Sequence, residues 1–176
     1  MRTNPSLGSQ ELKESILKRS WLMLLFFTLT CFGAATAGSA WTSASLNTWY
    51  AQLRKPALNP PSWSFGLVWS ALYLLMAVSA WLVWRSAGWN GAKYALVLFF
   101  LQLGLNVAWS YLFFGLHSPA AALTEIFFLL AAIVGTTIAF LPFSRIASWL
   151  MFPDAVWVSF AIYLNFQIWQ LNSGSR

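Results

Sequence analysis

Charged residues are scarce in this sequence: Lys, Arg, Asp and Glu make up 8% of its 176 residues. A soluble domain usually carries about 25% charged residues, so this chain lacks the means to cover itself with a water-facing surface. Hydrophobic residues account for 59%, and 12 tryptophans help to bring the aromatic share to 18%. The composition favours an integral membrane protein in a lipid bilayer, with rings available for the membrane interfaces or for a flat ligand.

Cysteine and histidine are almost absent, with one residue of each, Cys31 and His117. An intrachain disulfide is excluded, and neither residue has a neighbour at metal-ligand spacing, so we predict no metal site. Cys31 is interpreted as a small core residue, and His117, just before Pro119, as a solvated loop residue and not as an axial haem ligand. No Ser-His-Asp set or pair of catalytic carboxylates is visible, and no motif requires a cofactor.

Acidic residues are fewer than basic ones, 4 against 10, which gives a formal net charge of +6. Nucleic acid binding needs a clustered basic face, whereas these cations lie between apolar runs, so we expect no nucleic acid partner. Seven of the cations fall on the N-terminal side of the apolar runs and three, Arg54, Lys55 and Arg176, on the other. The positive-inside rule then predicts a cytoplasmic N-terminus.

Long apolar runs are abundant. Five of them reach the roughly 20 residues that cross a bilayer, at about 21–40, 63–84, 94–114, 119–140 and 149–171. We therefore predict an all-α membrane protein with a five-helix bundle over 21–172, a polar N-terminal tail at 1–20 and a short C-terminal tail at 173–176. The third and fourth spans must be antiparallel neighbours, because the connection between them is very short.

Some span beginnings allow two interpretations. The first span ends in the small residues AATAGSA and also resembles a secretory signal with a cleavage site. In the fifth, we interpret Asp154 as the residue that caps the helix after Pro153. Glu125, near the start of the fourth span, is equally compatible with an interfacial anchor and with a buried polar partner.

A row of polar side chains interrupts the third span. Gln102, Asn106 and Ser110 are four residues apart, which places them on one face of a helix. An amide that faced lipid would lack a hydrogen-bond partner, which is costly, so the row must face protein or a cavity. It is compatible with interhelical hydrogen bonds and with a ligand site.

Two other spans carry residues typical of a pocket. The fifth has Trp157, Ala161 and Asn165 four residues apart, so that a small side chain leaves a gap beside an indole. The second presents Trp69 and Tyr73 on one helical face. Rings and amides from several spans are therefore able to surround one space.

Small residues also recur at intervals of four. Gly33 is paired in this way with Ala37 in the first span, Gly104 with Ala108 in the third, and Gly135 lies between two alanines in the fourth. Because small side chains let helices approach closely, we predict that these positions mediate helix packing.

The connection between the first two spans is long and rich in proline. It contains Trp49, Lys55, Pro56, Pro60 and Pro61, and the prolines stiffen it so that it is able to cover one mouth of the bundle. The motifs WYAQLRKPALNPPSW, VWSALYLLM, QLGLNVAWSYLFF and WVSFAIYLNFQIWQLN, in this order, resemble the TspO/MBR family of tryptophan-rich sensory and translocator proteins. The resemblance runs from the first span to Asn172.

The resemblance implies a five-helix bundle with a ligand cavity capped by the first loop, and homodimers that often form through the third helix. It implies binding of porphyrins such as protoporphyrin IX and haem, of sterols, and of isoquinoline-carboxamide or benzodiazepine drugs. The protein would be a receptor in a bacterial cell membrane, acting in tetrapyrrole homeostasis or stress sensing. Light-dependent porphyrin degradation and transport of such ligands are the alternatives.

The positions at which the family contacts its ligands coincide with residues singled out above. The resemblance places contacts at Trp69, Asn106, Trp157 and Ala161, and at Tyr50 in the loop. We therefore expect a ligand site formed by Tyr50, Trp69, Tyr73, Gln102, Asn106, Ser110, Trp157, Ala161 and Asn165. In a light-driven reaction, Trp69, Trp157 and Tyr50 would be the electron donors.

The chain departs from the family pattern at two places. The family usually has Pro-Tyr where this chain has Pro153-Asp154, so an acid replaces a phenol. The sterol pattern of animal members requires a cation near a tyrosine. Tyr163 has no cation within reach, so sterol binding through that pattern is not expected.

Overall fold

The computed structural model describes residues 5–173, with side chains from Glu14 onward, and the regular structure in this part of the chain is helical. Five long apolar segments are able to cross a membrane: α1 (Pro5–Leu46), α3 (Ser62–Gly91), α4 (Lys93–Ser110) with its π-helical continuation η1 (Tyr111–Gly115), α5 (Pro119–Phe140) and α6 (Arg145–Asn172). A short helix, α2 (Trp49–Gln52), lies between α1 and α3. The predicted all-α, five-span architecture is confirmed.

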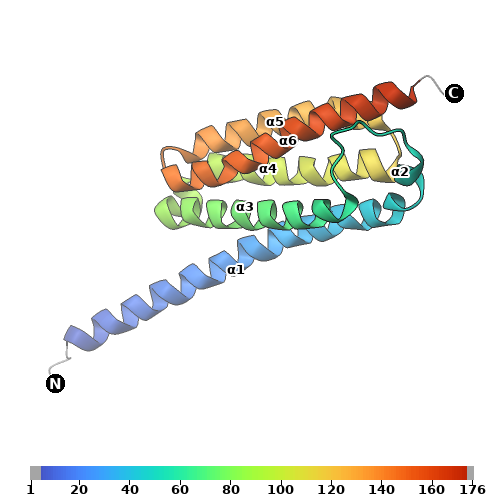
Figure 1. Ribbon diagram of the computed structural model, residues 1–176. Coiled ribbons are helices and arrows are strands. Elements are labelled where there is room, and N and C mark those ends of the chain that lie inside the picture. The colour runs from blue at the N-terminus through green and yellow to red at the C-terminus, as the bar shows by residue number, and fades with distance from the viewer. Residues whose placement is uncertain (1–4, 174–176) are drawn as a thin grey trace.

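The five long helices form a closed ring. Going round it, α1 packs on α3, α3 on α6, α6 on α5, α5 on α4 and α4 on α1. The tight turn after η1 makes α4 and α5 antiparallel neighbours, as predicted. The two chain ends lie at opposite ends of the bundle, and the α2 connection crosses the end near the C-terminus (Figure 1).

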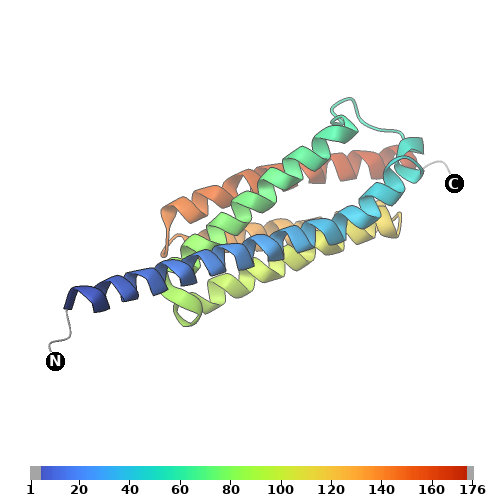
Figure 2. The same ribbon diagram turned by 90° about the horizontal axis from the view of Figure 1, so that it is seen from below.

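Helix α1 is much longer than the predicted first span. Its N-terminal part continues beyond the bundle as a straight extension (Figures 1 and 2). Glu14 and Lys18, four residues apart with 4.0 Å between charged atoms, form an ion pair on this extension, which is the spacing that supports a helix. The AATAGSA stretch lies inside α1, where the helix packs in the ring, so it serves as part of a bundle helix.

The predicted cap of the last helix is wrong. Helix α6 begins at Arg145, and the hydroxyl of Ser144 caps it by accepting from the amide of Ala147 at 3.2 Å. Asp154 lies in the interior of the helix, directly after Pro153. A serine N-cap satisfies the orphan amides of the first turn, so no second cap is needed and Asp154 faces the bundle axis.

The end of the bundle away from the α2 connection is solidly packed. Phe27, Phe99 and Phe140 meet there with ring centroids 6.1 and 6.2 Å apart, and none is exposed. Ser79 donates to the carbonyl of Ala147 at 2.7 Å, so α3 and α6 are hydrogen-bonded as well as packed. The space available for a ligand lies at the other end.

Candidate ligand-binding site

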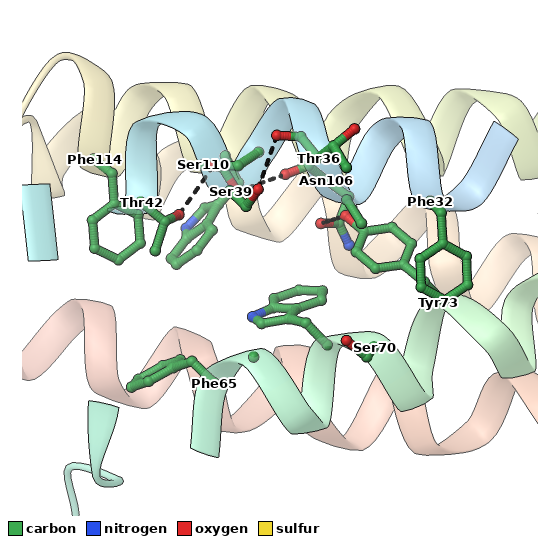
Figure 3. A pocket seen from close by; sticks show the side chains of 15 residues that line it. Phe32, Thr36, Ser39, Thr42, Phe65, Ser70, Tyr73, Asn106, Ser110 and Phe114 are labelled. Carbon is green, nitrogen blue, oxygen red and sulfur yellow. Dashed lines mark hydrogen bonds between the residues drawn. The ribbon is translucent and has the colours of Figure 1, made fainter. Parts of the chain in front are cut away.

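A cavity of about 280 Å³ lies between α1 and α3 and is backed by α4. Figure 3 shows Phe32 and Thr42 of α1 on one side of it and Phe65 of α3 on the other. Trp69 and Trp109 also line it. The cavity therefore has aromatic walls contributed by three helices.

The cavity opens sideways between α1 and α3. Thr36 and Ser39 of α1, and Gly66 and Ser70 of α3, line the cavity and are also exposed at the surface of the bundle. The two α1 hydroxyls donate to carbonyl groups of their own helix, Thr36 to Gly33 at 2.8 Å and Ser39 to Thr36 at 2.9 Å. Their hydrogen bonds are satisfied within the helix, so this opening can face lipid tails without penalty.

The back wall of the cavity is polar. The hydroxyl of Tyr73 donates to Oδ1 of Asn106 at 3.0 Å, and Ser110 donates to the carbonyl of Asn106 at 3.4 Å. The Nδ2 of Asn106 is buried and has no partner among the described residues. Because an amide N–H left unpaired in an apolar interior is costly, this donor is available to a ligand.

A second, much smaller cavity of about 30 Å³ lies toward α6 and is lined by Tyr50, Trp157, Ala161 and Asn165. Four aromatic residues belong to the linings of both cavities and separate them: Phe65, Trp69, Trp109 and Phe114. The Trp109 indole donates to Oδ1 of Asn165 at 3.2 Å, and Asn165 Nδ2 donates to the carbonyl of Pro119 at 2.7 Å. These bonds fix one side of the partition.

The structure thus brings together eight of the nine predicted ligand residues. Trp69, Tyr73, Asn106 and Ser110 line the larger cavity, and the other four line the smaller one, which Trp69 also borders. Gln102 lines neither cavity. It is fully buried and its Nε2 donates to the sulfur of Met76 at 3.3 Å, while its Oε1 has no partner in the described part of the chain.

The loop between α1 and α3 is fixed by several contacts. The Tyr50 hydroxyl donates to Oδ1 of Asn59 at 2.8 Å, and the Lys55 ammonium lies 4.7 Å from the centre of the Tyr50 ring. Asn172 at the end of α6 bonds both backbone groups of Arg54, at 3.1 and 3.0 Å. Burial raises the pKa of Tyr50, and its bond to Asn59 acts in the opposite direction, so the phenol keeps its proton at neutral pH.

The single histidine lines neither of these two cavities and lies instead at a third, open hollow of about 590 Å³ near the end of α6. The ring of His117 is stacked on Trp49 with centroids 4.5 Å apart, and its Nε2 is 3.1 Å from the hydroxyl of Ser45. Its φ of 52° places it in the left-handed region, where the chain turns from η1 into α5. Among the described residues, no group of three His, Cys, Asp or Glu side chains could hold a metal ion.

The glycines of the predicted small-residue pairs make no close approach to another helix within the chain. An added Cβ at Gly33, Gly104 or Gly135 would meet no atom within 4 Å, and Gly104 lies on the exposed face of α4. The close approach occurs at Gly38 instead, where an added Cβ would lie 3.0 Å from the hydroxyl of Ser110. Spacing of small residues is common in membrane helices, so by itself it does not identify the face that makes contact.

Glu125 is half-buried, and both of its carboxylate oxygens are buried and have no partner in the part of the chain described. Sequence reasoning also missed part of the cavity wall. Phe65, Trp109 and Phe114 were not singled out, although Trp109 and Phe114 follow Asn106 and Ser110 at helical spacing of three and four. That spacing is the signal that could have found them.

The sequence that forms these five helices and this cavity is similar to those of known proteins. Residues 26–170 match the sequence profile of the TspO/MBR family. The chain belongs to the TspO/MBR family. This TspO/MBR protein is 40% identical over 152 residues to the tryptophan-rich protein TspO of Archaeoglobus fulgidus, with 86% of this chain and 98% of the relative covered.

Two further relatives extend the comparison to bacteria and animals. The tryptophan-rich protein TspO of Chlorobaculum tepidum is 44% identical over 144 residues, covering 81% of this chain and 90% of that one. The human translocator protein is 35% identical over 158 residues, covering 89% of this chain and 94% of the human protein. The resemblance noted from the motifs is confirmed, and this TspO/MBR protein is a multi-pass membrane protein.

Proposed function

We propose that this protein is a membrane receptor that binds a tetrapyrrole such as protoporphyrin IX or haem, or another flat hydrophobic ligand, in the cavity between α1, α3 and α4. The observation that carries the proposal is the unpaired Nδ2 of Asn106, set among the rings of Trp69, Tyr73 and Trp109. A few directed polar groups within aromatic walls are typical of pockets for planar ligands.

Cavity size limits how such a ligand is held. The volume of about 280 Å³ is at the lower end of the roughly 300–1,000 Å³ of drug-sized pockets. A compact aromatic amide of the isoquinoline-carboxamide type would fill it. A porphyrin is larger, so it would extend into the opening between α1 and α3 or displace Trp69 and join the two cavities.

Tryptophan-fluorescence quenching tests the site directly. The purified protein in detergent is titrated with protoporphyrin IX, for the wild type and for Asn106→Ala. Loss of one hydrogen bond of about 1 kcal/mol should weaken binding roughly fivefold. Asn90→Ala, which removes an exposed amide at the other end of the bundle, should bind like the wild type. Equal affinities for all three proteins would reject the assigned site.

Light-dependent porphyrin degradation is the second candidate. Trp69 and Tyr73 line the larger cavity, and Trp157 and Tyr50 the smaller one, so oxidisable rings would surround a bound photosensitiser. Illumination of the complex, followed by porphyrin absorbance, separates this activity from binding. Bleaching at the rate of free porphyrin, with no change in Trp69→Phe, would leave binding as the function.

The loop between α1 and α3 is proposed as the lid of the site. Tyr50 from this connection borders the smaller cavity, and Asn172 attaches the loop to α6. A ligand in the joined cavities would then lie beneath the loop. Deuterium exchange of the loop amides should slow when ligand binds.

We also infer that the N-terminus is cytoplasmic and the C-terminus outside, in a bacterial cell membrane. The support is the excess of Lys and Arg on the N-terminal side, together with bacterial relatives such as the Chlorobaculum tepidum protein. Ser173→Cys should be labelled by an impermeant maleimide in intact cells. The native Cys31 is buried and should give little background. Labelling only after permeabilisation would place the C-terminus in the cytoplasm and contradict the proposed orientation.

A homodimer through α4 is proposed as well. Val97, Leu101 and Gly104 form an exposed face on this helix, and an added Cβ at Gly104 has free space. A second copy of α4 would be able to approach closely there. Gly104→Cys should form a disulfide-linked dimer in membranes, whereas cysteine at the exposed Phe128 of α5 should not.

A further inference from the structure

Asp154 is a carboxylic acid buried in the membrane bundle. Its exposed fraction is 1%, and neither carboxylate oxygen has a hydrogen-bond partner among the described residues. In this part of the chain the ion pair that forms is Glu14 with Lys18, so no cation neutralises Asp154. An isolated carboxylate in an apolar interior is so costly that it takes up a proton or recruits a partner.

The groups around Asp154 come from several helices. Two ionisable side chains, Cys31 of α1 and Tyr73 of α3, lie near enough to Asp154 to interact with it electrostatically. On α4, Asn106 is a neutral amide that accepts a hydrogen bond from Tyr73. The acid of α5, Glu125, lies about six residues further from the α5–α6 turn than Asp154 does, which is roughly 9 Å along the helix axis. Among the described residues, Asp154 therefore has no basic partner.

Tyr73 connects Asp154 to the ligand cavity. Its hydroxyl donates to Oδ1 of Asn106, and both residues line the cavity. An ionised carboxylate beside Tyr73 would compete with Asn106 for that hydroxyl proton, because hydrogen bonds to charged acceptors are the stronger ones. A protonated carboxyl group would not compete. The orientation of the Asn106 amide, whose Nδ2 is the unpaired donor, thus depends on the proton at Asp154.

We propose that Asp154 is a proton-binding site that couples proton uptake to ligand binding in the cavity. One proton from solvent binds the carboxylate; Tyr73 then keeps its bond to Asn106, and Asn106 presents Nδ2–H to the ligand. When the proton leaves, the Tyr73 hydroxyl turns to the carboxylate and this arrangement is lost. The coupling rests on the proposed ligand site, whereas the proton site itself does not.

The coupling is tested with a ligand that does not titrate. Protoporphyrin IX dimethyl ester has no carboxylates, so its affinity between pH 6.5 and 9 reports on the protein. For the wild type we expect binding to weaken about tenfold as pH rises over this range. Asp154→Asn and Tyr73→Phe should each bind with an affinity independent of pH.

Two control variants change ionisable side chains that lie away from Asp154. Glu14→Gln removes an exposed carboxylate, and His117→Asn removes the histidine, which lines neither cavity of the proposed site; both variants should keep the wild-type pH dependence. An affinity independent of pH in the wild type, or a pH dependence that survives in Asp154→Asn, would overturn the coupling.

Stability without ligand tests the proton site separately. As pH rises, loss of the proton leaves an unpaired carboxylate in the bundle, so the melting temperature of the wild type should fall. Asparagine has nearly the same shape as aspartate and no charge, so the melting temperature of Asp154→Asn should not fall as pH rises. The melting temperature of Glu14→Gln should fall in the same way as that of the wild type. Parallel profiles for the wild type and Asp154→Asn would overturn the proton site. If the ester binds at no pH, the ligand site and the coupling are rejected, and this measurement still decides the proton site.

Discussion

The two ends of the bundle use the same ring of helices and yet differ in their interior. At the end away from the loop, Phe27, Phe99 and Phe140 fill the axis completely. At the loop end, the same helices contribute Gly38, Asn106 and Ser110, and a cavity of about 280 Å³ remains. The size of the side chains at the axis, and not the arrangement of the helices, therefore decides where a cavity forms.

Three of the five described side chains that carry a buried polar atom without a partner lie where the packed end meets the cavity. Gln102 bonds Met76 and keeps a free oxygen, Asn106 accepts from Tyr73 and keeps a free N–H, and both oxygens of Asp154 are unpaired. A membrane protein retains such costly groups mainly where they serve a site. The region between the packed end and the cavity is thus where unpaired polar groups lower stability and are expected to serve a function.

The largest effect is expected at the packed end. Phe99→Ala removes a fully buried ring that contacts Phe27 and Phe140, and the resulting void should cost about 3–5 kcal/mol. Thermal unfolding in detergent measures the loss. Phe128→Ala removes an identical side chain from the exposed face of α5 and should cost far less. Similar losses for the two variants would mean that the packed end is not the stable part of the fold.

Gly38 tests how the cavity end is closed. A Cβ added there lies 3.0 Å from the hydroxyl of Ser110, whereas one added at Gly33 meets nothing within 4 Å. Gly38→Ala should cost about 1–3 kcal/mol through overpacking between α1 and α4. Gly33→Ala should be neutral or slightly stabilising, because alanine favours the helix. The difference between the unfolding temperatures of Gly38→Ala and Gly33→Ala measures the effect of the close contact. Equal unfolding temperatures would mean that Gly38 is not needed for the packing of α1 on α4.

The fold was largely predictable from the sequence because the constraint of the bilayer is simple. Apolar runs of sufficient length mark the spans, and a polar row such as Gln102, Asn106 and Ser110 has to face inward. All three residues are buried as predicted. The inward face of α4 therefore followed from the cost of an unpaired amide in lipid.

What could not be predicted depends on contacts between helices. The three-residue spacing of Asn106 and Trp109 does not reveal that Trp109 bonds Asn165 across the bundle. Asp154 was assigned to a cap because proline often begins a helix, but the Ser144 cap places it in the interior. Gly38 and Gly33 look alike in the sequence, and only the packing of α1 on α4 distinguishes them.

Ala161 tests whether a ligand uses both cavities. Ala161→Leu would fill the smaller cavity beside Trp157 without touching the larger one. Porphyrin binding should weaken about threefold to tenfold, since a lost or forced contact of this size costs roughly 1 kcal/mol. The affinity of Ala161→Leu for a compact isoquinoline carboxamide should equal that of the wild type. Ser159→Leu adds the same side chain on the exposed face of α6, and its affinity for porphyrin should also equal that of the wild type. Unchanged porphyrin binding to Ala161→Leu would confine the ligand to the larger cavity.

The smallest effect is expected at the loop. Asn172→Ala removes both hydrogen bonds to the backbone of Arg54, and the loop should open more often by about 1 kcal/mol, since exposed bonds contribute little each. Amide exchange of residues 53–59 should therefore become roughly fivefold faster, while the packed end around Phe99 exchanges as before. Asn47→Ala, an exposed amide at the same end of the bundle, should leave the loop unchanged. If Asn172→Ala has no effect, the bond of Tyr50 to Asn59 at 2.8 Å is what holds the loop, and the attachment to α6 contributes little to its order.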